Sequence, residues 1–143
     1  MALDLTPLDN AVTRLREGLA RYRLDESDSQ IRDGLIQRFE FTYELSHKML
    51  KRFLVATSAS PGEFDEMSFA DLIRSGNQRG LLRGDWTLWR GYRDMRAKTS
   101  HTYDEAVALD VVSGIEDFLN EAESLLSRLR NGLRGQGESG TPG

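Results

Sequence analysis

The residues best suited to chemistry lie in one short stretch, in which His101 follows Arg96 by five positions and Tyr103 comes two positions later. An imidazole can accept the proton of a ribose 2′-hydroxyl, and a guanidinium can neutralise the charge that develops on the attacked phosphate. One histidine and one arginine would therefore suffice for RNA cleavage without a metal ion. Nearby side chains that could contact RNA or a nucleotide are Arg93, Lys98 and Ser100.

The Arg96–His101 pair needs a break between two helices, because residues five apart on one continuous helix point about 140° away from each other. Thr102-x-x-Glu105 has the pattern of a capping box, which predicts that the last helix begins near Tyr103. The free N–H groups of that helix start would favour an anionic ligand beside His101. The alternative is a structural junction, in which His101 only bonds a backbone group.

The charge of the chain is uneven along its length. The net charge of its 143 residues is −4, yet seven basic and only two acidic residues lie between Arg74 and His101. A basic segment in an acidic protein favours an anionic partner such as RNA or a nucleotide, although a solvated helix face is the plainer interpretation. With no cysteine and two histidines, we expect no metal site and no cofactor. No apolar run is long enough to span a membrane, so we expect a cytoplasmic protein.

Apolar residues recur at helical spacing along most of the chain. This pattern predicts five helices, with approximate bounds 7–23, 30–56, 67–75, 86–98 and 103–131. We expect an all-α fold, an up-and-down four-helix bundle with one additional short helix. Residues 1–131 would form this single domain, and the glycine-rich residues 132–143 a disordered tail. In the helix at 86–98, we expect Leu88, Tyr92 and Met95 on the apolar side, and Trp89 on a separate side with Arg93 and Arg96. We interpret Trp86 and Trp89 as core or interface residues rather than as platforms on which bases stack.

The Arg96-x-x-x-x-His101-x-Tyr103 pattern resembles that of HEPN-domain proteins. Two longer segments, residues 32–45 and 99–105, resemble the small bacterial family of nucleotidyltransferase substrate-binding proteins. The likeness extends from the first helix to about Leu129. It implies a helical bundle that forms a homodimer, and a minimal nucleotidyltransferase as partner, usually encoded by the adjacent gene. In related pairs the HEPN protein is a ribonuclease toxin, and the transferase is an antitoxin that adds AMP to the motif tyrosine, here Tyr103.

The chain departs from the HEPN pattern at Ala97, where many ribonucleases of this kind have a polar residue after the motif arginine. His47 stands where relatives commonly have tryptophan, which we interpret as a packing variation. Arg38 could contact the ligand directly, or form an ion network with its charged neighbours on the second helix.

Three functions remain open from the sequence. The first is a HEPN-type, substrate-binding partner of a minimal nucleotidyltransferase that cleaves RNA through a dimeric Arg96–His101 site. The second is a binding module for a nucleotide or substrate, without catalysis, in which Tyr103 accepts AMP. The third is a helical scaffold whose site no longer acts.

Overall fold

The computed structural model describes residues 3–139, and no strand occurs within them. The long helices are α1 (Thr6–Leu24), α2 (Ser29–Ala56), α4 (Trp86–Lys98) and α6 (Ile115–Ser139). The shorter elements are the helices α3 (Phe69–Gln78) and α5 (Glu105–Ser113), and the 3-10 turns η1 (Pro61–Phe64) and η2 (Thr99–His101). The expected all-α fold is confirmed. No helix in the described part of the chain combines the length and apolar character needed to cross a lipid bilayer.

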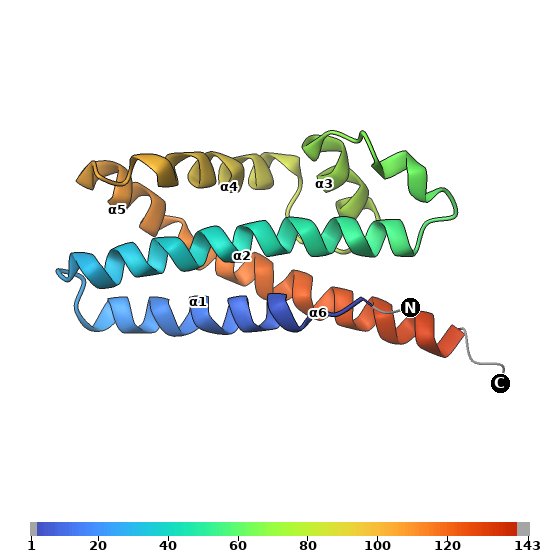
Figure 1. The fold of residues 1–143 in the computed structure, drawn as a ribbon, viewed down its shortest axis with the longest axis horizontal. Coiled ribbons are helices and arrows are strands. Elements are labelled where there is room, and N and C mark those ends of the chain that lie inside the picture. The colour runs from blue at the N-terminus through green and yellow to red at the C-terminus, as the bar shows by residue number, and fades with distance from the viewer. Residues whose placement is uncertain (1–2, 140–143) are drawn as a thin grey trace.

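Helix α2 lies at the centre of the molecule (Figure 1). It packs along α1 on one side, with α4 on another, while α6 crosses behind it and α5 links α4 back to α6. Its start is fixed by Asp28, whose carboxylate accepts hydrogen bonds from the backbone N–H groups of Gln30 and Ile31. Its broad apolar surface follows from this central position, because it contacts helices on several sides.

An aromatic cluster joins α2, α4 and α6. Its rings are those of Phe39, Tyr43, Trp89, Tyr92 and Phe118, and neighbouring rings meet edge-on with centroids 5.0 to 5.3 Å apart for three of the pairs. Trp89 is fully buried (0% exposed), which fits its expected role as a core or interface residue but shows that its expected place on the cationic side of α4 was wrong. The physical reason is that the indole N–H bonds the buried carboxylate of Glu121 on α6, 3.3 Å away, which allows the whole ring to enter the core.

The last helical segment differs from the prediction at its start and at its middle. Thr102 caps nothing: its hydroxyl donates to the carbonyl of Thr99, and Asp104 is the N-cap of α5, accepting from the N–H of Ala106. A continuous helix from Tyr103 to Asn131 was therefore wrong. Gly114 separates α5 from α6, and a Cβ at this position would lie 2.6 Å from the sulfur of Met95 on α4. The close approach of α4 accounts for glycine at this break.

Helix α6 continues to Ser139, so the expected helix end near Asn131 was wrong, and residues 132–139 are helical rather than disordered. Two contacts explain the extension. Gly132 lets the helix lie against the buried ring of Phe53, and Leu133 packs on the core. These contacts offset the low helix propensity of glycine. Residues 140–143 of the predicted tail lie outside the described residues.

Candidate functional site

Arg96 is held in a fixed orientation in the last turn of α4. Its Nε donates to Oε1 of Glu44 on α2 over 3.0 Å, and its Nη1 donates to the hydroxyl of Thr99 over 3.0 Å. The Thr99 hydroxyl in turn donates to the Arg96 carbonyl over 2.7 Å. The side chain is 35% exposed, and three of its five N–H bonds have no protein acceptor among the described residues. This guanidinium is positioned by the protein and still able to bind a ligand oxygen.

His101 ends the short turn η2 that follows α4, and its side chain is exposed. Its carbonyl accepts from the N–H of Asp104, but neither imidazole nitrogen bonds a protein group in the described part of the chain. The structure thus gives no support to a structural junction in which the imidazole bonds the backbone. The ring faces that of Tyr103 edge-on, with centroids 6.0 Å apart. Both ring nitrogens are available for proton transfer or ligand binding.

Tyr103 projects from the loop between η2 and α5 and is 86% exposed. The two tyrosines of the aromatic cluster contrast with Tyr103, since burial raises the pKa of Tyr43 to about 12 and also raises the pKa of Tyr92. Of these three phenols, Tyr103 is the one that a modifying enzyme can reach without unfolding the bundle.

The remaining predicted residues are Lys98 and Ser100 at the α4–α5 junction, Arg93 within α4, and Arg38 on α2. Arg93 lies over the ring of Phe69, with its guanidinium carbon 5.9 Å from the ring centroid. Lys98 bonds Asp110 of α5 over 2.8 Å, and that hydrogen bond and charge raise the pKa of the lysine. The hydroxyl of Ser100 donates to the carbonyl of Ala97. Lys98 and Ser100 therefore lie next to Arg96 and His101 along the chain, whereas the Arg93 guanidinium faces α3.

Arg38 is not brought to this junction within one chain. Its Nη1 donates to the carbonyl of Arg14 on α1 over 2.8 Å, and its side chain lines the groove between α1 and α2. On α2, six positions separate it from Glu44, which places the two side chains about 120° apart around the helix. Of its predicted ion network with Arg32, Asp33 and Glu40, only the contact between Arg32 and Asp33 occurs among the described residues, and Arg32 also pairs with Glu105 of α5.

Sequence reasoning missed two residues of the site, Glu44 and Thr99. Glu44 is separated from Arg96 by 52 positions, so only the packing of α4 on α2 reveals the contact. In the sequence Thr99 is one of several loop hydroxyls. In the structure it is buried, and its hydroxyl accepts from the Arg96 guanidinium and donates to the Arg96 carbonyl. The signal available in the sequence was a threonine directly after a basic helix end, and its burial is visible only in the structure.

Comparison with known proteins finds a family that this chain matches. The model of the family described as "Nucleotidyltransferase substrate binding protein like" matches residues 3–131. The chain belongs to this family. The match includes both segments on which the resemblance was based and the whole α4–α5 junction, so the resemblance found in the sequence is confirmed.

The matches to individual relatives cover nearly the whole chain. Probable ribonuclease HepT of Haemophilus influenzae is 40% identical over 136 residues, which cover 90% of this chain and 92% of the relative. A solved H. influenzae structure, said to reveal the fold of a substrate binding domain of a nucleotidyltransferase, has a TM-score of 0.83 and 38% identity, covering 89% of this chain and 99% of that one. A Thermus thermophilus crystal structure has a TM-score of 0.72 and 31% identity, covering 86% and 98%.

Proposed function

We propose that this protein is a ribonuclease that needs no metal ion and acts as the HEPN-type, substrate-binding partner of a minimal nucleotidyltransferase, in a toxin–antitoxin pair. The observation that supports it best is the junction itself, where Glu44 and Thr99 orient the Arg96 guanidinium while His101 remains unbonded. The similarity to a probable ribonuclease supports the activity, and the family description supports the transferase as partner.

The reaction follows from the two side chains. The imidazole of His101 takes the proton of a ribose 2′-hydroxyl, and the oxygen attacks the adjacent phosphorus. The bond from phosphorus to the 5′-oxygen breaks, which leaves a 2′,3′-cyclic phosphate and a new 5′-hydroxyl. Arg96 neutralises the charge that develops on the phosphate oxygens, and its planar N–H groups fit that geometry. The leaving oxygen needs a proton donor on the opposite side.

A homodimer supplies that donor in this proposal. His101 and Tyr103 are exposed in the single chain, and no wall excludes water from them. A twofold axis next to the junction would place two imidazoles and two guanidiniums around one phosphate, because a symmetric interface repeats the same residues from both chains. One imidazole then acts as base and the other as acid. The cleft between the chains would also accommodate the RNA.

The test is cleavage of RNA by the purified protein in the presence of EDTA. We expect the wild-type protein to cleave, and His101→Ala and Arg96→Ala to lose about 10²-fold or more in rate. Arg90→Ala is the matched control, since Arg90 is an exposed arginine of the same helix, and it should keep its activity. Equal rates for all four proteins, or no cleavage by any, would refute the ribonuclease. Expression without the transferase should arrest growth with the wild-type gene but not with His101→Ala.

A second function is favoured by the exposure of Tyr103: a binding module whose phenol accepts AMP. The phenolic oxygen would attack the α-phosphorus of ATP, the proton would leave the phenol, and pyrophosphate would be released. Incubation with the partner transferase and ATP should then add the mass of one or more AMP units. Tyr103→Phe should abolish this gain, and Tyr22→Phe, at a buried tyrosine, should keep it. Retention of the gain in Tyr103→Phe would exclude this residue as the acceptor.

A further inference from the structure

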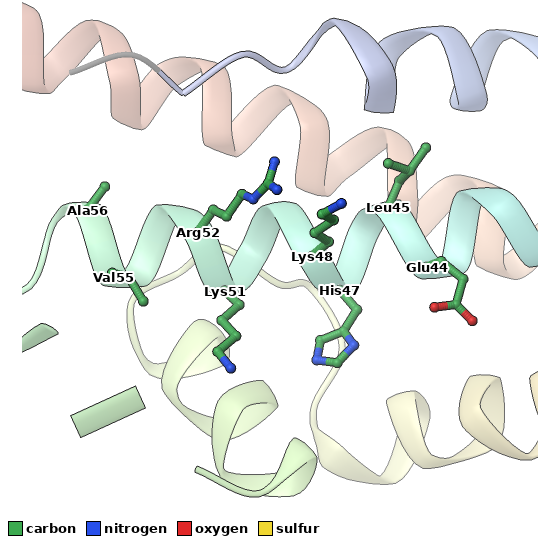
Figure 2. A pocket seen from close by; sticks show the side chains of 8 residues that line it. All are labelled: Glu44, Leu45, His47, Lys48, Lys51, Arg52, Val55 and Ala56. Carbon is green, nitrogen blue, oxygen red and sulfur yellow. The ribbon is translucent and has the colours of Figure 1, made fainter. Parts of the chain in front are cut away.

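One face of α2 has a charge that the proposed chemistry does not use. A shallow hollow of about 610 Å³ lies on this helix between Glu44 and Ala56 (Figure 2). Two rows of side chains form its walls: His47 and Lys51 point towards α3, while Lys48 and Arg52 point away from it. Leu45 and Val55 contribute apolar surface. We refer to these six residues, His47, Lys48, Lys51, Arg52, Leu45 and Val55, as the cationic face of α2.

The positive charges of this face are uncompensated. Lys48, Lys51 and Arg52 make no ion pair with any described residue, and the acid that lines the hollow, Glu44, pairs with Arg96 instead. Lys48 is three and four positions from the other two, and like charges at these spacings destabilise a helix by a few tenths of a kcal/mol. In a protein with a net charge of −4, such a cluster favours an anionic ligand.

The cationic face of α2 is continuous with the Arg96 site. Glu44 lies at one end of the hollow and bonds Arg96. The imidazole of His47 meets the ring of Phe69 edge-on at 4.8 Å, and Arg93 lies over the same ring. Burial lowers the pKa of His47, so this imidazole is neutral at pH 7. It contributes a polarisable ring to the hollow rather than a charge.

We infer that the cationic face of α2 binds the single-stranded RNA that flanks the phosphate cleaved at Arg96 and His101. This inference rests on the proposed ribonuclease function. Lys48, Lys51 and Arg52 bind phosphates, as basic grooves do in other proteins that bind single strands, while the bases lie against Leu45 and Val55. From Glu44 to Val55 the helix rises about 16 Å, which spans about five nucleotides at a stacked spacing of ~3.4 Å.

A single strand fits this face better than a second copy of the chain does. A symmetric contact across the face would bring its three cations against the same three cations of the partner, and like charges meeting in an interface cost several kcal/mol. RNA phosphates instead neutralise these charges. The hollow is also too open to enclose a small nucleotide, since all of its lining residues come from one helix.

The test compares two triple variants that remove the same charge. Lys48→Gln/Lys51→Gln/Arg52→Gln removes the cations of the face, and Arg14→Gln/Arg16→Gln/Arg21→Gln removes three arginines from α1. The probes are 2′-O-methyl RNA strands of about four and about ten nucleotides, which the proposed chemistry cannot cleave because the 2′-hydroxyl is blocked. Fluorescence anisotropy gives the Kd at several salt concentrations, and cleavage of a short unmodified RNA is measured in parallel.

We expect the α2 variant to bind the longer strand at least 10-fold more weakly, with a salt slope reduced by about 2, because each phosphate contact contributes about 0.7. Its binding and cleavage of short RNA should match the wild type, as should all results for the α1 variant. Equal losses in both variants, or a change of oligomeric state in the α2 variant, would overturn the inference. Unchanged binding with intact cleavage would refute the RNA path alone, whereas no cleavage by the wild type would refute the proposed function.

Discussion

Arg96 shows how a surface ion pair can act on orientation rather than on stability. Glu44, its partner, is more than half exposed, and ion pairs of this kind contribute between about 0 and 1 kcal/mol to folding. Arg96 donates hydrogen bonds to Glu44 and to Thr99 in different directions. Together these bonds hold the guanidinium in one orientation. Side chains that are already oriented lose less entropy when a ligand binds. In the proposed function Glu44 is therefore a positioning residue.

A substitution at Glu44 tests this role. Glu44→Ala should lower the rate of RNA cleavage by about 10² with a small change in KM, because Arg96 then samples unproductive positions. The melting temperature should hardly change, since the pair is exposed. The control is Glu116→Ala, which breaks a comparable exposed pair between α6 and Arg23 of α1, outside the Arg96 site. It should alter neither the cleavage rate nor the melting temperature. A normal rate for Glu44→Ala would show that Thr99 alone is enough to orient Arg96.

At the scale of elements, the buried carboxylate of Glu121 on α6 fixes the connection between α3 and α4. One of its oxygens accepts from the backbone N–H groups of Arg83 and Gly84 and from the indole of Trp89, at 3.0 to 3.3 Å. The other oxygen is buried with no partner among the described groups. The start of α4, and with it the direction in which Arg96 is presented, depends on this one side chain.

Loss of this carboxylate should therefore be costly. Glu121→Ala should lower the free energy of unfolding by about 3 kcal/mol, because two buried donors and one partly buried donor lose their acceptor. Glu121→Gln keeps an acceptor oxygen and should cost less. Urea denaturation followed by circular dichroism measures both changes. The neighbouring control is Glu123→Ala, which removes an exposed pair with Arg16 and should cost less than about 1 kcal/mol. Similar values for the two alanine variants would contradict this role of Glu121.

Substitutions at two glycines of α6 test whether the end of this helix is packed against the core or is a disordered tail. A Cβ at Gly132 would lie 2.6 Å from the ring of Phe53, which is buried in the core, whereas nothing lies within 4 Å of a Cβ at Gly135. Gly135→Ala should stabilise the protein by up to about 1 kcal/mol through helix propensity. Gly132→Ala should destabilise it by about 1 kcal/mol or more through overpacking. Thermal melting compares the two, and a disordered tail would give no change in either.

At the scale of the whole molecule, the proposed activity depends on assembly, because one chain presents its imidazole on an open surface. The rate of cleavage per chain should fall on dilution once the homodimer dissociates, and the sedimentation coefficient should fall over the same concentration range. Arg90→Ala should show the same dependence as the wild type. A constant rate per chain for a protein that is monomeric by sedimentation would contradict the dimeric site.

The sequence by itself determined the helical class and, closely, the bounds of α1, α2 and α4, because apolar periodicity and N-caps such as Asp85 are local signals. It also singled out Arg96, His101 and Tyr103, since their spacing lies within eight residues. Only the tertiary structure decided that Glu44 and Thr99 orient Arg96, that Trp89 is buried on Glu121, and that α6 extends past Gly132. These outcomes depend on contacts between residues distant in sequence, and packing across helices overrides local propensity wherever it buries enough surface.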